Sequence, residues 1–94
     1  MPVAAKLGDK GTKHDGYHET AITAASPTVF VDGLPAARLG DPLTAHSKRD
    51  HPPHPRQIST GSATVFIDGM PAARAGDAVD CGGVIVSTGT VNIG

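Results

Sequence analysis

Short runs of alternating side chains recur along the chain and predict β-strands. In the first clear run, Val29 and Val31 would face one side of a strand and Phe30 the other. The Asp32-Gly33 pair that follows is typical of a two-residue hairpin turn, so the chain is expected to return as an antiparallel strand. Gly and Pro are spread over the whole chain, which argues against helix.

The same pattern is repeated. Residues 26–41 recur 36 positions later as residues 62–77, without a gap and with most positions identical. A third copy is divided between the chain ends, because residues 90–94 joined to residues 1–9 align with residues 64–77. A closed object of like units fits this division, since an open solenoid would not need its ends to complete one another.

The predicted fold is therefore all-β, a closed arrangement of three pseudo-threefold-related β-hairpin units. It forms one domain over residues 1–94, with units at residues 28–41, 64–77 and the split 90–94 plus 1–9. The side chains expected to point inward are Val29, Val31, Val65, Ile67, Val91 and Ile93. A further strand is expected before each repeat core, around Ile58 and residues 84–86.

The composition indicates that an apolar core alone could not stabilise this fold. The chain has 94 residues with no Trp, one Tyr and two Phe, so it lacks the large rings that usually dominate a core. A domain of this size needs a staple, a metal or a partner. Cys81 is the only cysteine, which excludes a disulfide within the chain. A metal, a partner or both remain.

Charge and hydropathy exclude several other classes. The formal net charge of −1 gives no basic footprint for nucleic acid. No apolar run is long enough to span a bilayer, so stable membrane insertion is not expected. The N-terminal residues contain no apolar stretch resembling a secretory signal, and we expect a cytoplasmic protein unless something other than a cleaved signal moves it out.

Every histidine and the only cysteine lie in the loops that follow a Gly-Asp pair. His14 and His46 each come five positions after that aspartate, and Cys81 comes four positions after it. A lone histidine in such a loop is ordinarily a solvated surface residue. Here the threefold arrangement would bring one ligand from each loop toward the common axis.

The second loop offers a fourth ligand, which is either His51 or His54, and the spacing leaves both open. His18 is expected to face solvent, although it is a further candidate. Three histidines and one cysteine would form a closed tetrahedral site of the structural kind that suits zinc. A closed site leaves no open position for water, so an enzyme is not expected.

The motif at residues 35–38 and 71–74 carries a family resemblance. Both segments read Pro-Ala-Ala-Arg, and the chain resembles the PAAR-repeat family over essentially its whole length. The resemblance implies that the three β-hairpin units form a small pointed cone with a metal site at the apex, and that this cone caps the trimeric valine-glycine repeat spike of a type VI secretion system. It also implies a zinc ion near the apex, held by His14, His46 and Cys81 with His51 or His54. The split copy departs from the motif, with Lys6 in place of Arg and Val3 in place of Pro.

The resemblance implies a structural function. The cone would sharpen a membrane-puncturing spike and hold one structural zinc ion per chain. One cone would bind to each spike trimer, and it would leave the cell on the spike. The alternative is an adaptor that docks a separate effector protein onto the spike. A zinc hydrolase is the remaining and least favoured reading.

Overall fold

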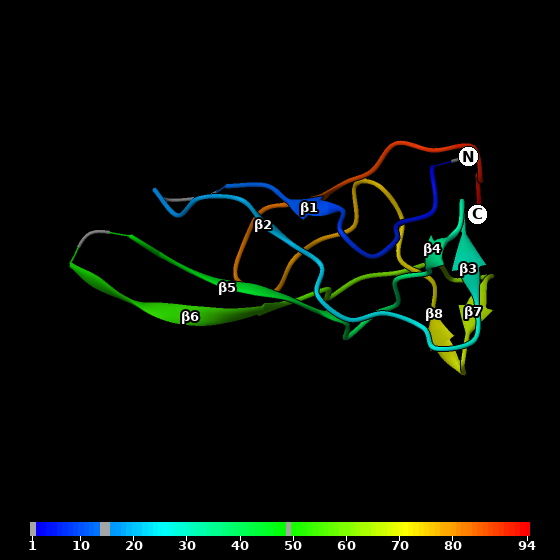
Figure 1. The fold of residues 1–94 in the computed structure, drawn as a ribbon, viewed down its shortest axis with the longest axis horizontal. Coiled ribbons are helices and arrows are strands. Elements are labelled where there is room, and N and C mark those ends of the chain that lie inside the picture. Colours follow the sequence, from blue (N-terminus) through cyan, green and yellow to red (C-terminus); the bar gives the residue numbers. More distant parts are fainter. Residues whose placement is uncertain (1, 14–15, 49) are drawn as a thin grey trace.

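All regular structure in the described part of the chain is β (Figure 1). The computed structural model describes residues 2–13, 16–48 and 50–94. The strands are β1 (Lys10–Gly11), β2 (Thr20–Ala21), β3 (Phe30–Val31), β4 (Leu34–Pro35), β5 (Pro42–Lys48), β6 (His51–Gln57), β7 (Phe66–Ile67), β8 (Met70–Pro71) and β9 (Ile85–Val86). β2, β1 and β9 form one antiparallel sheet, and the other strands pair as hairpins. The predicted all-β class is confirmed. Nothing in the described ranges could serve as a membrane-spanning helix.

Two hairpins form where the sequence places its Asp-Gly pairs. β3 pairs with β4, and β7 pairs with β8 in the same register. Asp32 and Gly33 have φ angles of 49° and 81°, and Asp68 and Gly69 have 53° and 80°. Both central residues of each turn thus adopt the left-handed conformation that a type I′ turn requires.

Three backbone segments close into a ring. The amide of Ala37 donates to the carbonyl of Ala5 at 3.0 Å. The amide of Ala73 donates to Ala37 at 2.9 Å, and the amide of Ala5 donates to Ala73 at 3.0 Å. The cycle returns to its first member, so each unit is hydrogen-bonded to both others. The ring confirms the predicted pseudo-threefold arrangement.

The two ends of the chain complete the third unit. Val3 pairs with Asn92 at the repeat position where β3 pairs with β4. The amide of Ile93 also donates to the carbonyl of Pro2 at 2.9 Å. Both ends lie at the blunt end of the molecule, beside the two short hairpins (Figure 1). The far ends of the sequence therefore build one hairpin-like unit without a covalent turn between them.

The basic residue of each repeat contacts the aspartate three positions later. Arg38 pairs with Asp41 and Arg74 with Asp77, both with N···O distances of 2.9 Å. Lys6 holds a longer contact of 3.4 Å to its own aspartate. These carboxylates also accept a hydrogen bond from the backbone amide of the basic residue, which fixes the turn. Lys6, which stands where the motif has Arg, therefore makes a longer ion pair with Asp9 but keeps the hydrogen bond that fixes the turn.

The aspartates of the hairpin turns tie neighbouring units together. Asp68 accepts hydrogen bonds from Ser26 and Thr28, and Asp32 accepts two from Thr90. The bond from Ser26, followed by that from Thr28, lowers the pKa of Asp68, and the bonds from the Thr90 hydroxyl and amide lower the pKa of Asp32. Since the folded-state pKa is lowered, the contribution of these bonds to stability is present at neutral pH. It is lost as the pH falls through that pKa.

The core has two layers, and the paired alanines of each repeat divide between them because successive strand residues face opposite sides. The layer nearer the short hairpins contains Ala4, Val31, Ala36, Ile67 and Ala72. The other layer contains Ala5, Ile22, Ala37, Leu43, Ile58, Ala73, Val79 and Ile85.

The predicted set of inward side chains is partly wrong. Val31 and Ile67 are buried, whereas Val29 is 38% exposed. The remaining three, Val65, Val91 and Ile93, are half-buried. Backbone segments from three units converge at the ring, and the residues that form its hydrogen bonds are all alanines. The bulk of the core comes instead from Ile22, Ile58 and Ile85, each of which precedes a repeat core.

The second predicted loop is a hairpin. β5 and β6 pair antiparallel with His46 opposite His54, and the register shifts on both sides of this pair. β6 contains Pro52, Pro53 and Pro55, which it tolerates because β5 is its one partner in the sheet. The hairpin extends the molecule to 40 Å along its long axis against 24 and 21 Å across, and it forms the narrower end (Figure 1).

Candidate metal centre

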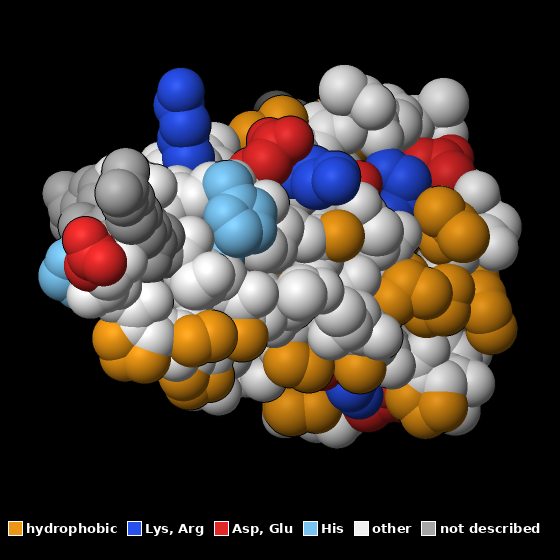
Figure 2. Space-filling model, turned by 60° about the vertical axis from the view of Figure 1, so that its left-hand side comes forward, with side chains coloured by type: hydrophobic (Ala, Val, Ile, Leu, Met, Phe, Trp, Pro, Cys, Tyr) orange, Lys and Arg blue, Asp and Glu red, His pale blue; other side chains and the backbone are white. Residues whose placement is uncertain are grey.

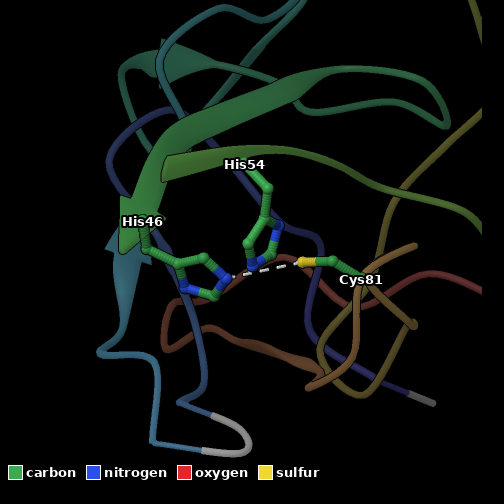
Figure 3. A group of neighbouring side chains, drawn as sticks. All are labelled: His46, His54 and Cys81. Carbon is green, nitrogen blue, oxygen red and sulfur yellow. Dashed lines mark hydrogen bonds between the residues drawn. The ribbon is translucent and has the colours of Figure 1, made fainter. Parts of the chain in front are cut away.

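His46, His54 and Cys81 converge between the long hairpin and the loop before β9. One potential ligand atom from each residue lies within 4.8 Å of the other two. His46 and His54 project from the same face of the hairpin because they are direct partners across its strands. Figure 3 shows both imidazoles directed toward the sulfur of Cys81. His46 is 1% exposed, and the other two side chains are half-buried.

Hydrogen bonds fix which nitrogen of each imidazole is available to a metal. His46 Nδ1 lies 2.8 Å from the carbonyl oxygen of His18, and His54 Nδ1 lies 3.3 Å from that of Pro55. A carbonyl only accepts, so Nδ1 carries the proton in both rings. In the neutral form of each ring, Nε2 is then the nitrogen whose lone pair could bind a metal. Backbone carbonyls hold metal-ligating histidines in this way in many proteins.

The spacing between sulfur and nitrogen suits a tetrahedral zinc ion. Bonds of about 2.3 Å to sulfur and about 2.05 Å to nitrogen at a tetrahedral angle separate the two ligand atoms by about 3.6 Å. Cys81 Sγ and His46 Nε2 are 3.7 Å apart. This pair of ligand atoms therefore has the spacing that a tetrahedral zinc ion needs, and His46, His54 and Cys81 together lie close enough to bind a metal ion.

The remaining sequence candidates fall in different places. His51 is exposed on β6 and does not belong to the cluster, which includes His54. His18 is also exposed, and its contribution to the centre is its backbone carbonyl. His14, predicted as the ligand from the first loop, lies outside the described residues.

Tyr17 covers the two histidines, a role that the sequence reasoning missed. Its ring stacks on His46 with centroids 4.8 Å apart and meets His54 edge-on at 4.5 Å. The ring therefore restricts the orientation of both imidazoles. The available signal was that the only tyrosine of the chain lies in the first histidine-bearing loop, between His14 and His18.

Arg56 lies beneath the centre and was also missed. It is 2% exposed, and its Nε donates to Cys81 Sγ at 3.3 Å. In sequence it is one basic residue after a proline-rich run, which is ordinarily a solvated position. No pattern in the chain distinguishes it from the exposed lysines.

Comparison with known proteins identifies one family. The model of the PAAR motif matches residues 7–87, which is nearly the whole chain. No curated protein matches the sequence.

Proposed function

The chain belongs to the PAAR-motif family, a family associated with the spike tip of type VI secretion systems, and on this premise we propose that it is the structural tip of such a spike. The blunt end of the cone docks on a trimeric valine-glycine repeat protein, and the narrow end leads during puncturing. The observation that carries this proposal is the cyclic ring of hydrogen bonds between Ala5, Ala37 and Ala73. Through it, one chain presents three similar units to three identical subunits.

The blunt end carries apolar side chains in a repeated arrangement. Phe30 and Phe66 occupy equivalent positions in two units and are 59% and 58% exposed, and Leu34 beside them is 42% exposed. Asn92 holds the equivalent place in the split unit. Hydrophobic side chains lie open at this end, which is at the right in Figure 2. Large exposed aromatic side chains are typical anchors of protein interfaces.

Mixing the protein with a trimeric spike fragment is expected to give one cone per trimer. Light scattering with composition analysis of the complex measures this ratio. Replacing Phe66 by Ser is expected to weaken binding by about tenfold or more, since truncation of an interface anchor costs about 2 kcal/mol. Val86, 51% exposed on β9, gives a matched control, and Val86→Ser should bind as the unchanged protein does. Three cones per trimer would contradict the symmetry argument.

The metal of the tip is proposed to be zinc, held by His46, His54 and Cys81 with His14 as the fourth ligand. Such an ion would join the first loop, the long hairpin and the loop before β9. The bound ion is structural, because four protein ligands close its coordination shell. We further propose that the protein leaves the cell with the spike.

Purified protein is expected to contain about one zinc per chain by elemental analysis. Cys81→Ser is expected to release most of it, because a hydroxyl is a poor zinc ligand beside a thiolate. His51→Ala is the matched control, since His51 lies on the same hairpin outside the cluster, and it should retain full metal content. Stoichiometric metal in the Cys81 variant, or none in the unchanged protein, would remove the centre from the proposal.

A further inference from the structure

Arg56 is a buried cation whose five N–H donors all have acceptors. Nε donates to Cys81 Sγ at 3.3 Å. Nη1 donates to the carbonyl of Gly11 at 3.1 Å and to the hydroxyl of Thr20 at 3.0 Å. Nη2 donates to the carbonyls of Thr12 and Gly82 at 2.9 and 3.2 Å. A guanidinium has only five such donors, so its capacity is used completely.

These acceptors belong to the segments that surround the candidate metal centre. Gly11 and Thr12 begin the first loop, and Thr20 opens the strand that follows it. Gly82 lies next to the cysteine in the loop before β9. Arg56 itself belongs to β6, the strand that carries His54. One planar group thus connects β6 with both ends of the first loop and with the loop before β9, and β6 in turn pairs with β5, which carries His46.

The backbone is shaped to receive the guanidinium. Gly83 has φ +84°, and a Cβ built there would lie 2.7 Å from the carbonyl oxygen of Thr12 and 3.2 Å from Arg56 Nη2. A Cβ at Gly11 would lie 3.1 Å from the same nitrogen. Both glycines therefore allow the backbone to approach Arg56 more closely than another residue would. The glycines thus indicate that the backbone around Arg56 is shaped to bind its guanidinium group.

Only one of the groups that accept hydrogen bonds from Arg56 can become negatively charged. Four of its acceptors are neutral carbonyl or hydroxyl oxygens, and none of the five in the described ranges is a carboxylate. A buried cation without a nearby anion is costly. Cys81 Sγ is the one acceptor that becomes an anion when it binds a metal, because the thiolate is the ligand form of cysteine.

We propose that Arg56 is a positioning residue of the metal centre, which holds Cys81 Sγ in place and donates a charge-assisted hydrogen bond to the metal-bound thiolate. The inference rests on the proposed metal centre. The bond from Nε withdraws electron density from the sulfur, and the four bonds from Nη1 and Nη2 keep the surrounding loops at ligand distance. The histidines define where the metal sits, and Arg56 defines the position and electronic character of its sulfur ligand.

Cobalt(II) replaces zinc as the probe, because its thiolate-to-metal charge-transfer band reports directly on the sulfur. In Arg56→Lys, loss of the directed Nε bond raises the energy of the sulfur lone pairs, so the band is expected to move to lower energy. Competition with a chromophoric chelator should show metal affinity reduced about 10–100-fold, the usual effect of removing such an outer partner. A change confined to packing would lower stability without moving the band.

Arg38→Lys is the matched control. Arg38 also donates through Nε and both Nη atoms, but to aspartates in the body of the cone, and Lys6 already occupies the equivalent position in the split copy. This variant should fold and show the unchanged cobalt spectrum. Thr20→Val is a milder second variant, which removes one Arg56 acceptor while retaining side-chain shape. It should move the band and the affinity in the same direction by less.

The outcomes separate the two proposals. If the unchanged protein binds neither zinc nor cobalt, the metal centre itself fails. If it binds cobalt and folded Arg56→Lys gives an identical band and affinity, only the role of Arg56 fails. If Arg56→Lys does not fold, the Thr20→Val spectrum decides, and an unshifted band there would overturn the inference.

Discussion

Removal of the metal by a strong chelator is expected to lower the melting temperature of the free protein by about 10–20 °C. Structural zinc sites in small domains supply on the order of 10 kcal/mol of apparent binding free energy. If only about 2.5 kcal/mol of this binding free energy contributes to folding stability, its loss lowers the melting temperature by that amount, because each kcal/mol changes it by roughly 4–8 °C in a domain of this size. Thermal scans with and without chelator measure the effect.

Metal removal is not expected to unfold the chain completely. The core layer nearer the short hairpins has its own buried side chains, Ala4, Val31, Ala36, Ile67 and Ala72. The hydrogen-bonded ring also lies outside the metal cluster. The narrow end, in contrast, depends on polar groups such as His46 and Arg56, which are buried and need their partners to remain in place.

The same chelation is expected to have a much smaller effect in the complex with a spike trimer. A partner that binds only the folded state shifts the folding equilibrium toward it, whatever the state of the metal. Cys81→Ser protein is the control, because its melting temperature should not respond to chelator in either sample. Equal sensitivity of the free and bound protein would show that the spike does not share the stabilising role.

The overall fold was predictable because its determinants are local and repeated. The Asp-Gly pairs fix type I′ turns through backbone conformation alone, and Asp32 and Asp68 adopt it as expected. The split third copy required the chain ends to meet, and Val3 pairs with Asn92 accordingly. The ring then closes because each of the three like segments donates a hydrogen bond to one neighbour and accepts one from the other.

The details that the sequence did not reveal depend on long-range packing. Val29 alternates correctly with Phe30 yet remains 38% exposed, because the alanine ring and the preceding isoleucines already fill the interior. The second histidine-bearing segment has the prolines of a loop, although it forms a hairpin whose register places His54 opposite His46 and His51 opposite Lys48. This register places His54, and not His51, beside His46 in the candidate metal centre. The spacing of the histidines in the sequence could not distinguish the two.

Ala37→Leu is expected to be the most damaging single substitution in the body of the cone. Ala5, Ala37 and Ala73 are each 1% exposed and lie in one core layer. Their backbones are joined by hydrogen bonds of 2.9 to 3.0 Å, so the segments cannot separate to admit a larger side chain without breaking the ring. Overpacking a close-packed core costs about 1–3 kcal/mol, and a constrained site favours the upper part of that range.

A cost of about 3 kcal/mol would lower the melting temperature of the metal-loaded protein by roughly 12–24 °C. Ala24→Leu is the matched control, because Ala24 is exposed and the same added carbons should leave the melting temperature nearly unchanged. If Ala37→Leu melts within a degree or two of the unchanged protein, the layer must contain room that the ring geometry does not suggest. A large loss would instead explain the Ala-Ala pair of each repeat. One alanine of each pair lies in each core layer, and the methyl group would then be the largest side chain that each of the three converging segments can place beside the ring.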